Sequence, residues 1–133
     1  MNDFTNILRQ HNLKATPQRL EIIHTIFMYG HINIDKLYEE VKNKFTSISL
    51  ATIYKNINAM IDNLLLEEVK LPNKKSVYEI IKQKHSHLLC IKCSSVVDID
   101  IELNNIKEEI PKNLNFTIKN SDLVISGICQ DCK

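Results

Sequence analysis

The sequence predicts an α+β protein with two domains: a helical N-terminal domain that ends in a β-hairpin, and a smaller C-terminal α/β domain. Three observations lead to this prediction. Apolar residues recur at helical spacing through residues 2–61, and two strand-like runs follow them. Beyond residue 85 the chain is richer in strand-like runs and carries paired cysteines. We place the boundary in the Lys-Gln-Lys segment between these parts, which gives domains of residues 1–82 and 85–133.

The first two predicted helices have clear signals. Apolar residues at helical spacing indicate a helix over residues 2–11. Thr16 and Pro17 then mark a helix start, because threonine caps free N–H groups and proline lacks the N–H that a first turn leaves unpaired. This second helix runs to about Tyr29, and Gly30 stops it.

The rest of the N-terminal domain completes a helix-turn-helix order. Asn33 caps a third helix, and Ser49 begins a fourth that ends at residues 62–63. We expect five apolar side chains of the fourth helix to face inward: Leu50, Ile53, Ile57, Met60 and Ile61. Strands at 65–71 and 76–81 flank a Pro-Asn-Lys turn. Short helices followed by a two-stranded hairpin are typical of a winged helix-turn-helix domain.

The C-terminal domain is predicted to contain four strands and one helix. The pattern indicates strands at 86–91 and 95–101, and then a helix over 102–110 that a proline ends. A closing hairpin is expected from residues 115–120 and 123–128, followed directly by the second cysteine pair.

Composition describes an ordinary globular chain. Of 133 residues, 44% are hydrophobic and 25% are charged, and the net charge is +1. No apolar run is long enough to span a bilayer, and the N-terminus lacks the pattern of a signal peptide, so we expect a cytoplasmic protein with no membrane partner. A net charge near zero neither indicates nor excludes nucleic-acid binding, because phosphate contacts need only a local basic patch.

Two Cys-x-x-Cys pairs are the most specific chemical signal. Cys90 and Cys93 form the first pair, and Cys129 and Cys132 form the second. In a reducing compartment, such pairs favour a metal site over disulfides, and four thiolates around one Zn²⁺ make a closed, structural site. The alternative is four free buried cysteines.

A second set of possible ligands contains only nitrogen and oxygen. His85 and His87 are two residues apart, so on a strand they point to one face, and Asp98 on the next strand is able to reach that face. Glu79 at the end of the hairpin and His31 between two helices would extend the set. Imidazoles and carboxylates suit Fe²⁺ or Mn²⁺, and because the donors come from both halves of the chain, binding would fix the angle between the domains. The alternative is a scatter of surface polar residues.

The fourth helix carries candidates for DNA contact. Its outer N-terminal face would present small, hydroxyl, aromatic and amide side chains that suit the major groove: Ala51, Thr52, Tyr54, Lys55 and Asn58. Lys14, Arg19, Lys74 and Lys75 would meet the DNA backbone or the minor groove. The alternative is an ordinary solvated helix face.

These residues resemble the ferric uptake regulator (Fur) family. The resemblance is carried by Ala15-Thr-Pro-Gln-Arg19, Ser49-Leu-Ala-Thr-Ile-Tyr54, the His-x-His-x-x-Cys-x-x-Cys run from His85 to Cys93, and Cys129-x-x-Cys132. It covers nearly the whole chain in order. It implies a homodimeric, metal-activated repressor whose winged helix binds an AT-rich inverted repeat. It also implies that the C-terminal domain dimerises and holds structural zinc on the four cysteines.

Within the family, the chain is most similar to the peroxide-responsive branch. His31, His85, His87 and Asp98 match that branch's sensor ligands, whereas Ser86 and Asn120 stand where the extra C-terminal metal site of iron-uptake members needs ligands. In such a sensor, bound Fe²⁺ reacts with peroxide and a ligand histidine gains oxygen, His31 or His85 here. One departure favours the alternative of an iron-uptake or other metal-uptake repressor without peroxide sensing. Peroxide sensors carry aspartate where this chain has Glu79.

Two further classes of protein compete with this interpretation. Nucleobase deaminases need His-x-Glu before their Cys-x-x-Cys and an open position on zinc. This chain has His-x-His, and four cysteines would close the zinc, so we expect no enzyme. A zinc-ribbon interaction module would leave the Thr-Pro helix start and the 49–61 helix unexplained.

Overall fold

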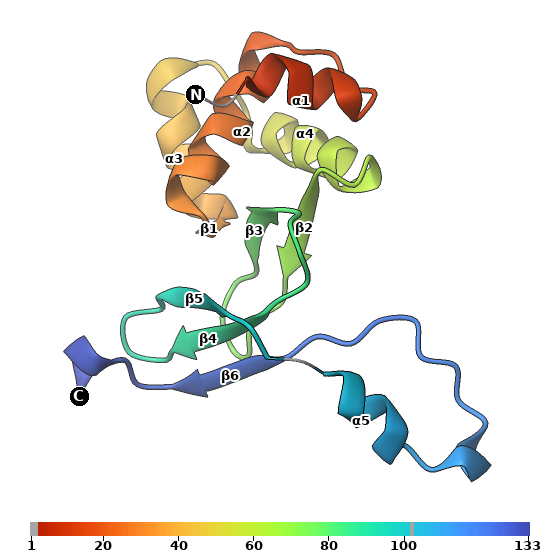
Figure 1. The fold of residues 1–133 in the computed structure, drawn as a ribbon. Coiled ribbons are helices and arrows are strands. Elements are labelled where there is room, and N and C mark those ends of the chain that lie inside the picture. Colours follow the sequence, from red (N-terminus) through yellow and green to blue (C-terminus); the bar gives the residue numbers. More distant parts are fainter. Residues whose placement is uncertain (1–2, 102) are drawn as a thin grey trace. The chain divides into compact units, whose positions relative to one another are not determined.

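The computed structural model describes residues 3–101 and 103–133, which form two compact units, Met1–Lys82 and Gln83–Lys133 (Figure 1). Residues 2 and 102, at the ends of two predicted helices, lie outside the described residues. None of the helices within the described ranges has the length and apolar character needed to cross a membrane.

Four helices make up most of the first unit: α1 (Phe4–Gln10), α2 (Pro17–Tyr29), α3 (Ile34–Lys44) and α4 (Leu50–Asp62). Each begins after a short polar side chain that accepts a backbone N–H three residues on. The cap residues are Asp3, Thr16, Asn33 and Ser49, with distances of 3.2, 3.2, 2.9 and 3.1 Å. The predicted caps at Thr16, Asn33 and Ser49 are confirmed. The predicted stop is confirmed too, since Gly30 has a φ of 77° that disfavours other residues.

A three-stranded antiparallel sheet closes the first unit, with strands in the order β1-β3-β2. Strands β2 (Leu66–Val69) and β3 (Val77–Ile80) form the predicted hairpin. Strand β1 (Ile32–Asn33) was not predicted, because two residues are too short to show any periodicity. It pairs with β3 and leads directly into α3, which fixes the end of the α2–α3 connection against the hairpin.

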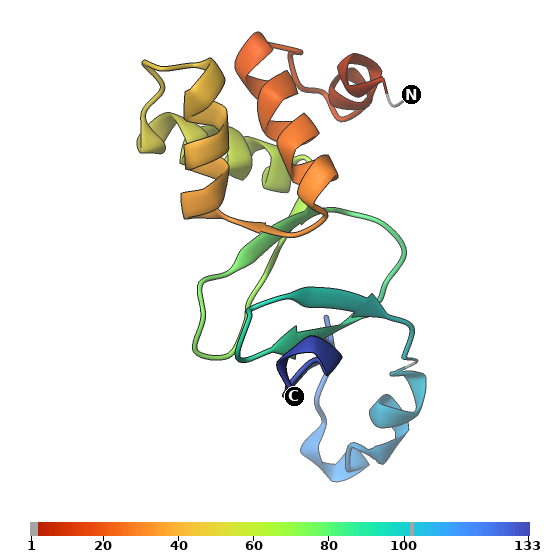
Figure 2. The ribbon, with the colours of Figure 1, turned by 90° about the vertical axis from the view of Figure 1, so that its left-hand side faces the viewer.

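The core of the first unit gathers the apolar faces of all four helices and the sheet. Its fully buried side chains include Leu8, Ile23, Ile26, Leu37, Ile53, Ile57, Met60 and Leu66. Helices α2 and α3 pack side by side, as the view in Figure 2 shows. The prediction that Leu50 faces inward is wrong, because this first residue of α4 is 37% exposed. The core is filled from the next turn of the helix, by Ile53 and its neighbours.

The second unit is built on a sheet with strands in the order β5-β4-β6. Strands β4 (Ser86–Cys90) and β5 (Val96–Ile99) are antiparallel, and β6 (Val124–Gly127) runs parallel to β4. A short helix, α5 (Asn104–Glu109), and two 3-10 turns, Lys112–Leu114 and Gln130–Cys132, complete it.

The predicted closing hairpin is wrong. Residues 115–120 form an irregular connection, visible in Figure 1 as a long loop that leads to β6. Asn115 adopts a left-handed conformation with φ of 47°, which interrupts an extended run at its start. The last strand therefore pairs with β4, more than thirty residues earlier in the chain.

The two faces of this second sheet differ in chemistry. Leu88 on β4 lies opposite Val97 on β5 and Ile125 on β6, and these three side chains are 40%, 54% and 41% exposed. His87, one residue earlier, lies opposite Asp98, so this pair points to the other face. One face thus presents an apolar row to its surroundings, and the other carries titratable groups.

Candidate metal centres and DNA interface

The four cysteines form one cluster within the second unit. Cys90 ends β4 and Cys93 lies in the following turn, while Cys129 and Cys132 flank the last 3-10 turn. Their Sγ atoms all lie within 4.8 Å of one another. The parallel pairing of β6 with β4 makes this possible, because it places Cys90 opposite Gly127, two residues before the second cysteine pair.

Backbone hydrogen bonds favour thiolates at this cluster. The N–H groups of Cys93 and Cys129 donate to the Sγ of Cys90 over 3.5 and 3.4 Å. These two hydrogen bonds lower the pKa of the Cys90 thiol to about 6, and the bond from Cys93 has the larger effect. A hydrogen bond with Cys129 raises the pKa of Cys132 to about 12 instead. Sulfurs packed this closely are not all ionised unless a cation lies among them, so the low pKa of one thiol and the high pKa of another are consistent with a cluster that needs a metal.

The donor set fits Zn²⁺. Four sulfurs suit a tetrahedral ion with a preference for soft ligands, and N–H bonds to sulfur stabilise the ionised ligands. No position would be open for a substrate, so such a site serves structure rather than catalysis. It would fasten the end of the chain to the central strand of the second sheet.

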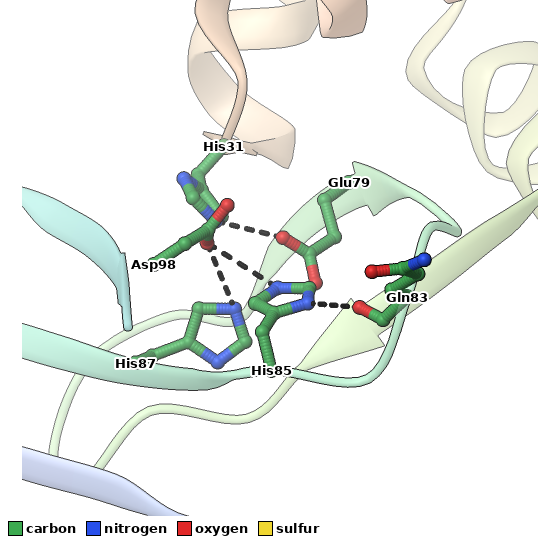
Figure 3. A network of polar contacts seen from close by, with 6 residues as sticks. All are labelled: His31, Glu79, Gln83, His85, His87 and Asp98. Atoms are coloured by element: carbon green, nitrogen blue, oxygen red, sulfur yellow. Dashed lines mark hydrogen bonds and ion pairs between the residues drawn. The ribbon is translucent and has the colours of Figure 1, made fainter. Parts of the chain in front are cut away.

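A histidine and a glutamate meet in the first unit. The Nε2 of His31 lies 2.7 Å from Oε2 of Glu79, as Figure 3 shows. Glu79 lies on β3 and only 1% of it is exposed. His31 immediately precedes β1, whose pairing with β3 brings the imidazole to the carboxylate. Burial of a carboxylate is costly without a partner, and this contact supplies one.

Two histidines and an aspartate meet in the second unit (Figure 3). Oδ1 of Asp98 lies 3.3 Å from Nε2 of His85 and 3.4 Å from Nε2 of His87. The imidazole rings are 4.5 Å apart between centroids. Asp98 stands opposite His87 in the β4–β5 ladder, and His85 precedes β4 by one residue, so strand register alone brings the three together.

The hydrogen bond at the far side of His85 decides what this cluster is able to bind. Its Nδ1 is 2.8 Å from the carbonyl oxygen of Gln83, an acceptor, so Nδ1 carries the proton and donates. The lone pair of a neutral His85 then sits on Nε2 and faces a carboxylate oxygen. Two electron-rich atoms in this position call for a proton or a metal cation between them. Two adjacent ligands of one metal ion, each bonded over about 2.1 Å, lie about 3 Å from each other. The spacing of these nitrogen and oxygen atoms is close to that value.

Five side chains predicted for DNA contact lie on α4. Ala51, Tyr54, Lys55 and Asn58 are exposed and Thr52 is half-buried, whereas the buried residues of the helix occupy its other side. This solvent-facing surface therefore contains all five residues that the sequence suggested. Their contact with DNA is a prediction that the structure leaves to experiment.

The four predicted basic contacts have different surroundings. Lys14 is exposed before α2, and Lys74 is half-buried at the hairpin tip. Lys75 is exposed and forms an ion pair with Asp35 of α3. Arg19 is half-buried and donates from Nε to the Oδ1 of Asn56 over 3.0 Å. Sequence reasoning missed Asn56, although its position four residues after Thr52 places it on the same flank of α4.

Comparison with known families decides the membership of the chain. The model of the ferric uptake regulator family matches residues 10–126. The chain belongs to the ferric uptake regulator family. Members of the Fur family are transcriptional regulators that bind DNA and dimerise.

Individual members of the Fur family resemble the chain over most of its length. The peroxide-responsive repressor PerR of Staphylococcus epidermidis is 29% identical over 128 residues, which cover 95% of this chain and 85% of that protein. The crystal structure of the Campylobacter jejuni peroxide stress regulator is 33% identical, with a TM-score of 0.71 over 98% of this chain and 100% of that one. The Vibrio cholerae ferric uptake regulator is 28% identical, with a TM-score of 0.76 over 96% and 100%. The winged-helix and α/β fold class predicted from the sequence is confirmed.

Proposed function

We propose that this protein is a homodimeric, metal-dependent repressor that releases DNA in response to peroxide. The observation that carries the proposal is the cluster in which one carboxylate faces the Nε2 atoms of His85 and His87. Two imidazoles and one carboxylate with open positions are the donor set of non-haem Fe²⁺ sites. Similarity to a peroxide-responsive repressor and to a peroxide stress regulator supports the same conclusion.

We propose further that the two donor groups hold a single Fe²⁺ or Mn²⁺. The ligands would be His31 and Glu79 from the first unit, and His85, His87 and Asp98 from the second. Glu79 and His85 are six residues apart in the sequence, so their separation is limited to about 20 Å even when the chain is extended. We propose that this short connection lets the two groups reach one ion. Imidazole and carboxylate donors without sulfur suit Fe²⁺ and Mn²⁺, while geometry and metal supply decide which ion occupies the site.

A metal shared between the units would convert metal occupancy into DNA affinity. Ligands from both units restrain the connection at residues 82–84, and so restrain the orientation of the α4 surface in each protomer. A ligand shifts such an equilibrium only by its difference in affinity between the two arrangements. All five donors contribute to that difference, because the ion is fully coordinated only when both groups are close together.

Peroxide sensing would follow from the redox chemistry of the ion. When bound, Fe²⁺ supplies the one-electron chemistry toward peroxide that Mn²⁺ lacks under the same conditions. The resemblance to peroxide sensors points to the imidazole of His31 or His85 as the side chain that gains oxygen, and an oxidised imidazole would fit less well as a ligand. Glu79 favours a second candidate function, a metal-uptake repressor without peroxide sensing, because peroxide sensors of the family carry aspartate there.

The DNA target is proposed to be an AT-rich inverted repeat. A two-fold symmetric dimer presents its two α4 surfaces related by the same symmetry as an inverted repeat. The exposed row of Leu88, Val97 and Ile125 is a suitable surface for dimerisation, since it would remove apolar side chains from water. The zinc cluster on Cys90, Cys93, Cys129 and Cys132 would support this sheet. We place the protein in the cytoplasm with DNA as its partner, without enzymatic activity.

DNA binding measured before and after peroxide tests the proposal. Protein purified without oxygen is loaded with Fe²⁺ or with Mn²⁺, and its affinity is measured for a duplex carrying an AT-rich inverted repeat. We expect both ions to support binding, and peroxide to abolish it only with Fe²⁺. Peptide mass spectrometry should then find one added oxygen on His31 or His85. Loss of binding without histidine oxidation would reject the peroxide mechanism, and metal-independent binding would reject the metal switch.

A further inference from the structure

A line of hydrogen bonds connects the start of α2 with the first turns of α4. The Nη1 of Arg19 donates to the carbonyl oxygen of Lys14 over 3.2 Å, and its Nε donates to Oδ1 of Asn56 over 3.0 Å. The Nδ2 of Asn56 donates in turn to the carbonyl oxygen of Thr52 over 2.9 Å. Thr16 accepts the backbone N–H of Arg19 at the cap of α2. All these residues lie within the first unit, around the exposed surface of α4.

The amide of Asn56 can satisfy this arrangement in only one orientation. Its oxygen faces an arginine donor and its nitrogen faces a carbonyl acceptor, so exchanging the two would set donor against donor and acceptor against acceptor. The guanidinium is therefore held in one plane by two acceptors. Guanidinium carries five N–H donors, and among the described residues the side chain of Arg19 makes no hydrogen bonds beyond these two. Three donors are left for a ligand.

The charge of Arg19 is also uncompensated. Within the described part of the chain, Arg19 forms no ion pair with a carboxylate, unlike Lys75, which pairs with Asp35. Both acceptors of its side chain are neutral groups, which orient the guanidinium without cancelling its charge. Exposed Lys14 and Lys55 are close in sequence to these acceptors. A fixed guanidinium with free parallel donors matches the oxygens of a phosphate.

We propose that Asn56 is a positioning residue that presents the Arg19 guanidinium to a backbone phosphate of bound DNA. This inference rests on the proposed DNA-binding function and names a pair of residues that serves it. An arginine that is already immobilised loses less side-chain entropy when it meets its ligand. Asn56 also donates a hydrogen bond to the backbone of α4. The distance between the phosphate contact of Arg19 and the exposed surface of α4 is therefore fixed.

Salt dependence of DNA affinity separates this role from a purely structural one. The Mn²⁺-loaded proteins are titrated with a duplex carrying an AT-rich inverted repeat at several salt concentrations, and thermal unfolding is recorded in parallel. Each Arg19 that meets a phosphate contributes about 0.9 to the slope of log affinity against log salt, so Arg19→Ala should lower it by about 1.8 per dimer. Arg19→Lys keeps the charge, so it should keep most of the slope and lose affinity.

Variants of Asn56 test the positioning. Asn56→Ala should weaken binding about five- to 150-fold, the cost of immobilising one long side chain in each protomer of the dimer, and retain most of the slope. Asn56→Asp should pair with Arg19 and keep the thermal stability, yet it should bind DNA more weakly than Asn56→Ala and with a reduced slope, because its charge cancels that of the guanidinium. Asn43→Ala, an exposed asparagine of α3, is the matched control and should behave as wild type.

Two results would overturn the roles assigned to Arg19 and Asn56 and leave the proposed function standing. In the first, wild type binds the duplex and Arg19→Ala has an unchanged slope. In the second, Asn56→Asp binds as tightly as wild type, which is the behaviour of a link that serves only stability. Failure of the metal-loaded wild type to bind any duplex would instead refute the proposed function, and this assignment with it.

Discussion

The cysteine cluster and the nitrogen-and-oxygen donors are assembled by the chain in contrasting ways. The four cysteines all belong to the second unit, with their sulfurs within 4.8 Å of one another. The other donors are divided, with His31 and Glu79 in the first unit and His85, His87 and Asp98 in the second. A metal site complete within one unit contributes to the folding of that unit. A set of ligands divided between two units is instead suited to couple metal occupancy to the orientation of the units.

The chemistry of the ligands strengthens the contrast. Thiolates bind Zn²⁺ tightly, and a closed set of four leaves no position for exchange. Imidazoles and carboxylates bind divalent ions of the first transition row more weakly, and the order of affinity among those ions leaves selectivity to geometry and supply. A chain that needs one permanent metal and one exchangeable metal therefore uses sulfur for the first and nitrogen with oxygen for the second.

Removal of a zinc ligand should have the largest effect. We expect Cys93→Ser to lose one zinc per chain and to unfold the second unit, because structural zinc contributes on the order of 10 kcal/mol in small metal-dependent folds. Zinc content by mass spectrometry, circular dichroism and size-exclusion chromatography measure the result. Ser94→Ala, in the same turn, is the control and should keep its zinc. Unchanged zinc content in Cys93→Ser would show that the cluster is not the metal site.

Removal of the carboxylate from the other donor group should leave the fold intact and disable the switch. Asp98→Ala should retain zinc, yet its Mn²⁺ affinity should fall by at least about 100-fold, more than is lost with an outer-shell partner. Calorimetric titration of Mn²⁺ and DNA binding at fixed Mn²⁺ report the two losses. Brief exposure of wild type to a chelator should reproduce this phenotype and spare the zinc. If Asp98→Ala were unfolded, both sets of donors would be needed for folding, and the contrast between them would be refuted.

A shorter carboxylate at position 79 should tune the divided set without destroying it. Glu79→Asp withdraws the carboxylate by one methylene from its 2.7 Å contact with His31. We expect metal binding to persist, and the rate of histidine oxidation by peroxide to change by up to roughly hundredfold, the size associated with a misplacement of about one ångström. Mass spectrometry of the Fe²⁺ form, on samples quenched at successive times after peroxide is added, gives the rate. Equal oxidation rates in wild type and Glu79→Asp would show that Glu79 takes no part in peroxide sensing.

A helix cap that belongs to neither set of donors should have the smallest effect. Thr16→Ala removes the hydroxyl that accepts the N–H of Arg19 and should lower the free energy of unfolding by about 1 kcal/mol. Urea denaturation of the metal-loaded protein measures it. Zinc content and Mn²⁺ affinity should match wild type, which sets the scale for an ordinary change in stability. A loss of either metal in this variant would mean that the sites and the helical core are coupled.

Local chemistry made much of this fold predictable. Thr16, Asn33 and Ser49 cap helices because their side chains reach a backbone N–H three residues on, an interaction encoded within one turn. The pairing of His87 with Asp98 likewise follows from two adjacent strands joined by a short turn. The error at residues 115–120 and the missed strand β1 both concern partners distant in the chain. So does the link from Arg19 to Asn56.

The helices, the cysteine pairs and the types of ligand follow from local sequence, because caps, periodicity and spacing act over a few residues. The parallel pairing of β6 with β4, which joins the two cysteine pairs, emerges only when the chain is folded. The same holds for the pairing of β1 that brings His31 to Glu79, and for the hydrogen bond from Arg19 to Asn56. These contacts depend on which distant segments share a core, and that choice is made by burying the whole chain rather than by any local pattern.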